Sequence, residues 1–393
     1  MINQTILYLP HTDCNHPKLK PYAKKLDISV HWDPDRTLGI PLTKIFKQVI
    51  RYEIGSDYAA LGVIQTNQKI IDLVSEHKPK YVIWPTMSYE IQEETFQKIR
   101  QLGAYVVGWF FDDECRFDEY SRWWIPYMDY FLTADLGSIH RYQELGAKAL
   151  HLPVTADSDY FKPVPSTTTY DISFIGSKTV ADRGNLIERF ATDGIPIATF
   201  GKGWAAGFVS HDEMRRIYST SKINICFTKS CGVNTRNQLK DKIFVITMCG
   251  GFLLCEYVEG IEKFFEIGKE VICFHSYQDA LDKAKYYLCN DSERECIAQA
   301  GMLRSRTEYS QLALLKRVFD IIEADTAFKT KRFFVNPHAK LPENVLKLKE
   351  QYHARWAQVL QETGFDELRW REEYEIARCF QKLPNNVSQA SIS

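Results

Sequence analysis

Four short apolar segments within residues 170–256 decide the fold of this chain: DISFI (171–175), IPIATF (195–200), INICF (223–227) and FLLC (252–255). Loops of glycine, lysine and small polar residues follow them, and helices are predicted between them at residues 182–190 and 235–248. Continuous apolar strands that alternate with helices are typical of a parallel sheet covered on both faces. Such sheets bind ligands beyond the carboxyl ends of their strands. We therefore expect this half of the chain to hold a phosphorylated ligand.

The first half shows the same alternation and predicts a second Rossmann-like sheet. The pattern predicts an α/β protein with an N-terminal domain at residues 1–160, a C-terminal Rossmann-like domain at 161–325, and a helical extension with a disordered tail at 326–393. Residues 152–169 contain three prolines and a polar run, which is typical of an interdomain linker. Strands are predicted at 5–9, 81–84, 104–111, 130–133, 149–153 and 270–274, and helices at 42–52, 66–77, 90–102, 137–145, 261–266, 277–289, 291–306 and 312–322.

Composition excludes several classes of protein. A formal charge of −1 over 393 residues argues against a general nucleic-acid binder, which needs a basic surface. No apolar run reaches membrane-spanning length, and the first residues lack the pattern of a signal peptide. The ten cysteines are scattered without a Cys-x-x-Cys pair or zinc-ligand spacing, which favours reduced thiols, a cytoplasmic location and no metal site.

Ten short motifs occur in a characteristic order over roughly residues 80–320. In the first half they are FDD (111–113), LPVTAD (152–157) and YFKP (160–163). In the second half they are DISFIG (171–176) followed by Arg183, FGKGW (200–204), IYSTSKINI (217–225), LKDKIF (239–244), CGGFLL (249–254), FFEIGKE (264–270) and IAQAG (297–301). In this order and spacing the motifs resemble those of the CgeB-type glycosyltransferases of the GT-B fold.

The resemblance implies two facing Rossmann-like domains with a cleft between them. The second domain would hold a nucleoside-diphosphate sugar as substrate, with no further cofactor, and the first would face a glycan, glycolipid or protein-linked acceptor. A final helix, after about Leu312, would cross back to the first domain. Many retaining GT-B enzymes carry two glutamates where this chain has Asn237 and Val245, which leaves the donor and the stereochemistry open.

Cleavage of a sugar–phosphate bond leaves a nucleoside diphosphate with growing negative charge, which an enzyme without a metal must meet with cations and backbone N–H groups. The candidate cations are Lys178, Arg183, Lys202 and Lys242, and the helix expected after Asn234 would add N–H groups at its start. Lysines beside loops can equally be solvated surface residues.

Other candidates for the nucleotide-sugar site follow the same strands. Glycines at strand ends allow close approach of a ligand, or serve only their turns. Trp204 could border the base or pack within the domain, and Glu256 could bind a ribose or sugar hydroxyl. The complete predicted set is Gly176, Ser177, Lys178, Arg183, Gly201, Lys202, Gly203, Trp204, Thr228, Asn234, Lys242, Gly250, Gly251 and Glu256.

Acidic residues and a histidine follow two strands of the first half. Asp112 and Asp113 follow a central strand, and His11 and Asp13 follow the first one. A carboxylate or imidazole in the cleft could deprotonate an acceptor hydroxyl, so the predicted catalytic residues are Asp113, His11 and Asp112. The alternative is a solvated turn or a helix cap.

The sequence therefore predicts a metal-independent glycosyltransferase that moves a sugar from a nucleoside-diphosphate donor to a hydroxyl acceptor. A non-catalytic protein that binds a nucleotide or sugar on the same fold is the main alternative. A nicotinamide dehydrogenase is a weaker one, since GKGWAA (201–206) matches the dinucleotide fingerprint but no acidic residue ends the next strand.

Overall fold

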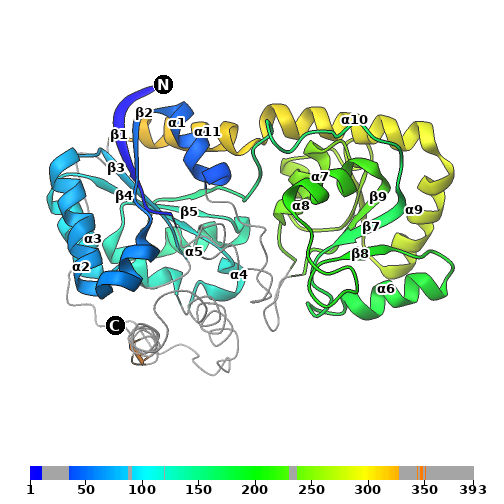
Figure 1. Cartoon of the computed structure of the whole chain (residues 1–393), viewed down its shortest axis with the longest axis horizontal. Coiled ribbons are helices and arrows are strands. Elements are labelled where there is room, and N and C mark those ends of the chain that lie inside the picture. Colours follow the sequence, from blue (N-terminus) through cyan, green and yellow to red (C-terminus); the bar gives the residue numbers. More distant parts are fainter. Residues whose placement is uncertain are drawn as a thin grey trace.

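The computed structural model describes residues 1–10, 35–86, 91–118, 120–229 and 237–326, together with residues 343, 346, 347 and 350. Two parallel sheets organise these residues and lie side by side (Figure 1). The six-stranded sheet of the first domain has the order β2-β1-β3-β4-β5-β6, and the five-stranded sheet of the second domain has the order β11-β10-β9-β7-β8. The strands are β1 (Ile2–Tyr8), β2 (Phe46–Arg51), β3 (Tyr81–Thr86), β4 (Tyr105–Phe110), β5 (Tyr130–Thr133), β6 (Ala149–His151), β7 (Tyr170–Ile175), β8 (Ala198–Phe200), β9 (Ser221–Cys226), β10 (Leu253–Glu256) and β11 (Ile272–Phe274).

Helices cover both faces of each sheet, as the apolar strands predicted. Successive residues of β1 point to opposite faces, and both Ile6 and Leu7 are fully buried in separate apolar clusters. The helices are α1 (Ile40–Ile45), α2 (Ile54–His77), α3 (Glu93–Gln101), α4 (Asp113–Arg116), α5 (Ile139–Glu144), α6 (Arg183–Thr192), α7 (His211–Thr220), α8 (Asp241–Met248), α9 (Tyr277–Cys289), α10 (Asp291–Glu308) and α11 (Gln311–Ala324), with the short helical turns η2 (Asp35–Gly39), η3 (Ser121–Tyr127), η4 (Leu136–Ser138) and η5 (Ile261–Lys263).

Several predicted helices differ from the structure. The helix predicted at 261–266 is only the short turn η5 at 261–263, and the one predicted at 66–77 begins earlier, at Ile54. The helix predicted at 42–52 ends at Ile45, and residues 46–51 form the edge strand β2, which pairs in parallel with β1. Pairing with β1 and burial of Phe46 against Phe319 outweigh the helical spacing of this segment. The helix predicted at 235–248 begins only at Asp241, because the residue before it, Lys240, is extended.

Helix α11 returns from the second domain and packs on the first, as the resemblance implied (Figure 1). The Lys80 ammonium lies 2.7 Å and 2.8 Å from the two Glu323 carboxylate oxygens, and the Tyr81 hydroxyl donates to the same carboxylate at 2.6 Å. The Phe319 ring packs edge-on against Phe46 at 4.8 Å between centroids. The chain therefore connects the two domains twice, through residues 152–169 and through α10–α11.

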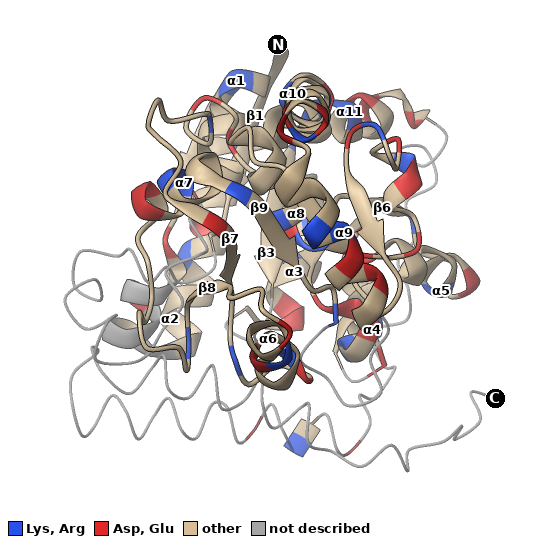
Figure 2. Cartoon of the chain, turned by 90° about the vertical axis from the view of Figure 1, so that its right-hand side faces the viewer, with Lys and Arg blue, Asp and Glu red and all other residues tan. Residues whose placement is uncertain are grey.

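Acidic and basic residues are intermixed over the second domain (Figure 2). Among the described residues, no helix has both the length and the apolar character required to cross a membrane. The predicted helical extension at 326–393 falls almost entirely outside the described residues.

Candidate functional site

The carboxyl edge of the second sheet contains a point where the strand order reverses. The chain leaves β7 for β8 on one side and later returns to β9 on the other side. Loops that leave two neighbouring strands in opposite directions open a crevice at this edge, and open α/β sheets bind ligands there.

The loops after β7 and β8 are held in direct contact. The Gly176 N–H donates to the Phe200 carbonyl at 2.8 Å, and the Lys178 N–H donates to the Lys202 carbonyl at the same distance. The indole N–H of Trp204 donates to the Gly176 carbonyl at 2.8 Å. Trp204 therefore fixes the shape of the loop after β7. This contact agrees with the alternative prediction, in which Trp204 packs within the domain.

Gly201 is required for this contact between loops. Its φ is +113°, and a Cβ at this position would lie 2.6 Å from the Gly176 oxygen. Gly207 ends the same loop with φ +65°, and a Cβ there would meet no atom within 4 Å beyond its chain neighbours. Gly203 has φ +81° and lies against the Lys178 side chain.

We expect Gly201→Ala to lower the free energy of unfolding by about 2 to 3 kcal/mol, because backbone strain and a clash with backbone atoms act together. Gly207→Ala is the matched control, because it introduces backbone strain without a clash. It should lower the free energy of unfolding by about 1 kcal/mol. Urea unfolding of both variants checks the difference. Equal costs would mean that the two loops can separate freely.

Two cations lie behind this edge, the buried Arg183 and the half-buried Lys242. Arg183 is the first residue of α6, is 7% exposed, and donates from Nη2 to the Lys229 carbonyl at 2.8 Å. Lys242 is the second residue of α8 and donates from Nζ to the Ile175 carbonyl at 2.8 Å. Both cations lie 6.0 Å from the centre of the Phe174 ring.

Burial lowers the pKa of Lys242, while nearby Asp241 raises it and the positive charge of Arg183 lowers it further. Two neighbouring cations repel one another, and an anion between them would relieve that repulsion. The amino end of α8 adds its dipole at the same place, although the Lys242 N–H already donates to the Asp241 carboxylate at 2.8 Å.

The other two predicted cations are placed differently. The Lys178 ammonium is paired with the Glu188 carboxylate at 2.9 Å and lies 5.2 Å from the Trp204 ring. Lys202 contributes its backbone carbonyl to the contact between the loops. Ser177 and Thr179 are within hydrogen-bond distance of each other on the exposed surface of the loop, at 3.1 Å.

Thr228 follows β9, Glu256 ends the neighbouring strand β10, and the two residues are hydrogen-bonded to each other. The Glu256 carboxylate accepts from the Thr228 backbone N–H at 2.9 Å and from its hydroxyl at 3.3 Å. These bonds tie the two strand ends together at the edge that carries Arg183 and Lys242.

Gly250 and Gly251 were predicted on the binding edge, and this was wrong. They follow the end of α8 and precede β10, so they lie at the amino edge of the sheet. A Cβ on Gly250 would meet Pro163 and Met302, and one on Gly251 would meet Asn224 and the Tyr218 carbonyl at 2.6 Å. Close packing at the base of the sheet explains both glycines.

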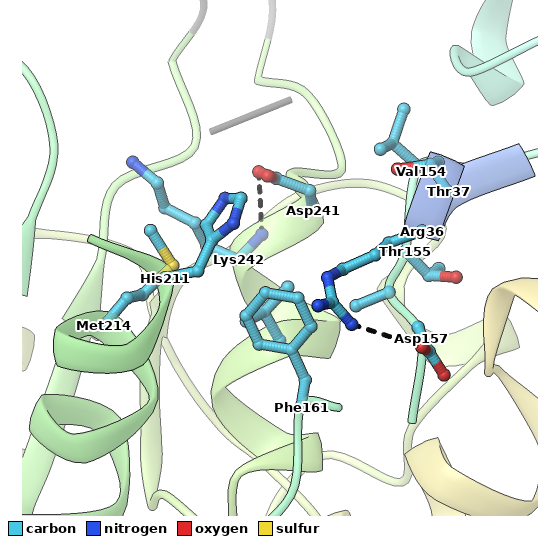
Figure 3. Close-up of a pocket in the computed structure, with 12 residues that line it drawn as sticks. Arg36, Thr37, Val154, Thr155, Asp157, Phe161, His211, Met214, Asp241 and Lys242 are labelled. Atoms are coloured by element: carbon cyan, nitrogen blue, oxygen red, sulfur yellow. Dashed lines mark hydrogen bonds and ion pairs between the residues drawn. The ribbon is translucent and has the colours of Figure 1, made fainter. Parts of the chain in front are cut away.

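A pocket opens between the two domains next to Lys242. Figure 3 shows Phe161 between Arg36 on one side and His211 and Lys242 on the other. Arg36 and Thr37 belong to η2 of the first domain, whereas the other residues come from the linker, α7 and α8. The lining residues are Arg36, Thr37, Val154, Thr155, Ala156, Asp157, Phe161, His211, Met214, Asp241, Lys242 and Val245.

Two carboxylates of the first domain meet the second domain across the cleft. The Gln238 side-chain amide donates to Asp112 at 3.3 Å and to Glu114 at 3.0 Å, and its oxygen contacts the Lys240 ammonium. Asp112 has φ 56° and ψ 32°, which is left-handed backbone and uncommon outside glycine. The Asp112 carboxylate thus lies where the two domains face each other.

Asp113 was predicted to face the cleft, and this was wrong. Its side chain is fully buried and accepts from Ser121 and Thr133 at 2.5 Å each and from Tyr142 at 2.9 Å. Burial raises its pKa to about 6, against the lowering effect of these three hydroxyl groups. Asp113 holds the first turn of α4 in place. The predicted residues His11, Asp13 and Asn234 lie outside the described residues.

Sequence reasoning missed Glu114, Gln238, Lys240 and Arg36. Glu114 follows the predicted Asp112 and Asp113 directly, so the same argument could have included it. Gln238 and Lys240 were assigned to the interior of a predicted helix, and Arg36 lies in a segment without a recognisable pattern.

Residues 183–318 match a family whose description is Glycosyl transferase-like. This part of the chain is similar to glycosyl transferases. The match favours the glycosyltransferase prediction over a non-catalytic binding protein. The dehydrogenase alternative fails, because GKGWAA is followed by a loop that continues to Ser210 and does not open a helix.

Solved structures of low sequence identity share the fold. HepE of Anabaena, in complex with UDP and glucose, is 10% identical with a TM-score of 0.54, covering 82% of this chain and 100% of that chain. Sucrose-phosphate synthase of Thermosynechococcus elongatus is 9% identical with a TM-score of 0.55, covering 81% and 98%. A glycosyltransferase of Rickettsia africae is 11% identical with a TM-score of 0.52, covering 82% and 98%. The predicted GT-B fold is thereby confirmed, and no curated protein matches the chain.

Proposed function

We propose that this protein transfers a sugar from a UDP-sugar to a hydroxyl group of a glycan or glycosylated acceptor. The observation that carries the proposal is the pair of cations, buried Arg183 and half-buried Lys242, at the point where the strand order reverses. Two cations and the amino end of α8 suit a diphosphate that gains charge as the sugar departs. UDP is the nucleotide of choice because the structure of HepE from Anabaena contains UDP and glucose.

We propose further that the transfer needs no metal and no cofactor, with the charge of the leaving diphosphate met by Arg183 and Lys242. The ordered motifs support membership of the CgeB-type subfamily. A cytoplasmic location fits the described cysteines, which are all free thiols.

Calorimetry tests the donor half of the proposal. UDP should give a measurable heat of binding. Uridine, which lacks the diphosphate, should bind much more weakly. GDP, TDP and CMP serve as comparison nucleotides. If none of the four nucleotides binds, the proposal of a nucleotide-sugar enzyme is wrong.

Asp112 is our candidate for the group that accepts the proton of the acceptor hydroxyl, because it lies in the cleft opposite the second domain. Asp112→Asn should lower kcat by about 100-fold or more, the usual contribution of a general base, and leave UDP affinity unchanged. Asp171→Asn is the control, since Asp171 is exposed and pairs with Lys222 on the amino side of the second sheet. Wild-type turnover by Asp112→Asn would assign the proton to another group.

A further inference from the structure

Tyr160 of the linker lies between arginines from both domains. The Arg36 guanidinium carbon lies 3.7 Å from the centre of the Tyr160 ring, and that of Arg215 lies 4.5 Å from the same centre. Arg36 belongs to η2 of the first domain and Arg215 to α7 of the second. One aromatic ring therefore receives a cation–π contact from each domain.

We call Arg36, the Tyr160 ring and Arg215 the sandwich. Further hydrogen bonds and ion pairs attach each of its two arginines to its own domain. In the second domain, Asp212 accepts from the Tyr160 hydroxyl at 2.8 Å and from Arg215 at 3.0 Å. In the first domain, Asp35 precedes Arg36 and binds Arg51 of β2 at 2.6 Å. The Tyr160 ring thus connects α7 to the edge of the first sheet.

The ion pair between Lys44 of the first domain and Asp159 of the linker is more exposed. Its N–O distance is 2.9 Å, and the two side chains are 44% and 76% exposed. The Arg215 side chain is 17% exposed and the Arg36 side chain 34%, and Arg36 also lies 3.9 Å from the Asp157 carboxylate of the linker. Because exposed ion pairs contribute little, the sandwich matters more for the orientation of the domains than this ion pair does.

The sandwich also borders the pocket beside Lys242. Arg36 contributes to both, and Asp157 and Phe161, on either side of Tyr160 along the linker, line the pocket as well. A rotation of the first domain that separated Arg36 from Tyr160 would remove one wall of this pocket. The shape of the pocket therefore depends on the contact between Arg36 and Tyr160.

We propose that Tyr160 is a hinge latch: its ring, held between Arg36 and Arg215, keeps the two domains closed around the pocket beside Lys242. Tyr160 acts as a positioning residue through Arg36. The inference that the pocket binds UDP rests on the proposed function. The latch itself depends only on the contacts among Arg36, Tyr160 and Arg215. Two cation–π contacts of ordinary strength shift the equilibrium between the open and closed arrangements of the two domains by about tenfold. This is enough to favour the closed arrangement and still permit opening.

Small-angle X-ray scattering of the full chain, with and without UDP, tests the latch. Tyr160→Leu removes the ring, and Tyr160→Phe keeps the ring but removes the bond to Asp212. Tyr160→Leu should increase the radius of gyration without ligand and weaken UDP binding by about tenfold. Tyr160→Phe should scatter as the wild type does. Lys44→Ala, which removes the exposed ion pair, is the control and should also leave the scattering unchanged.

The outcomes separate the latch from the proposed function. Identical scattering of Tyr160→Leu and the wild type would overturn the latch, and so would expansion of Tyr160→Phe equal to that of Tyr160→Leu. If the wild type binds no UDP while Tyr160→Leu is expanded, the proposed function fails and the latch stands. If circular dichroism shows that Tyr160→Leu is unfolded, Arg36→Leu replaces it in the scattering experiment. The same increase in the radius of gyration is expected.

Discussion

Lys242→Met is expected to weaken UDP binding by about 10- to 100-fold, since a charge-assisted hydrogen bond contributes about 1.5 to 3 kcal/mol. The Lys242 side chain is half-buried beside Arg183, at the amino end of α8, where water screens its charge less than on an open surface. Methionine keeps a similar length and removes the charge. Titration calorimetry with UDP measures the loss, and uridine should bind both proteins alike because it carries no phosphate.

Lys222→Met is the matched control for this loss. Lys222 lies near the amino end of β9, at the opposite edge of the sheet, where it pairs with Asp171 at 2.7 Å. Its replacement should leave UDP affinity unchanged. If Lys242→Met binds UDP as tightly as the wild type does, Lys242 has no part in the nucleotide site.

The pH dependence of UDP binding should also depend on Lys242. Burial lowers its pKa from the ordinary 10.5, so its ammonium loses a proton at lower pH than that of an exposed lysine. An anion binds the protonated form more tightly. The affinity of the wild type should therefore fall as the pH rises toward 10.5, and that of Lys242→Met should fall less.

Much of the fold could be predicted because its strands are buried on both faces and read as continuous apolar runs. β7, β9 and β10 each appear in the sequence as such a run, and each lies close to its expected position. β2 could not be predicted this way. It is an edge strand with exposed positions, and its assignment depends on β1, which lies about 40 residues earlier in the chain.

The position of a candidate residue was predictable where a single strand end determines it. Arg183 follows β7 by a short loop and Lys242 starts α8, so both reach the expected edge. Gly250 and Gly251 precede a strand, and this order already indicated the opposite edge. The contact of Gln238 with Asp112 and Glu114 joins residues 126 and 124 positions apart in different domains, and no local pattern reports such a contact.

Asp113→Ala should lower the free energy of unfolding by about 3 kcal/mol at pH 5, roughly 1 kcal/mol for each hydroxyl that it leaves without its acceptor. These hydroxyls belong to Ser121, Thr133 and Tyr142. Asp113→Asn is the milder variant, because the amide oxygen still accepts and the hydroxyls can rotate to accept from its N–H₂ group. Urea unfolding measures both. A cost below about 1 kcal/mol for alanine would mean that the hydroxyls find other partners.

The pH dependence of unfolding distinguishes this buried role of Asp113 from the catalytic role that the sequence predicted. Burial raises the pKa of Asp113 from 3.8 to about 6, so the folded protein binds this proton more tightly than the unfolded chain does. The contribution of Asp113 to stability is then complete below pH 3.8 and is lost as the pH rises through about 6. Over this range the wild type should lose stability relative to Asp113→Asn, which cannot titrate. At pH 7 we expect Asp113→Asn to retain most of its transferase activity, because Asp112 and Glu114 stay on an intact α4 turn; a stable but inactive Asp113→Asn would restore Asp113 as the catalytic base.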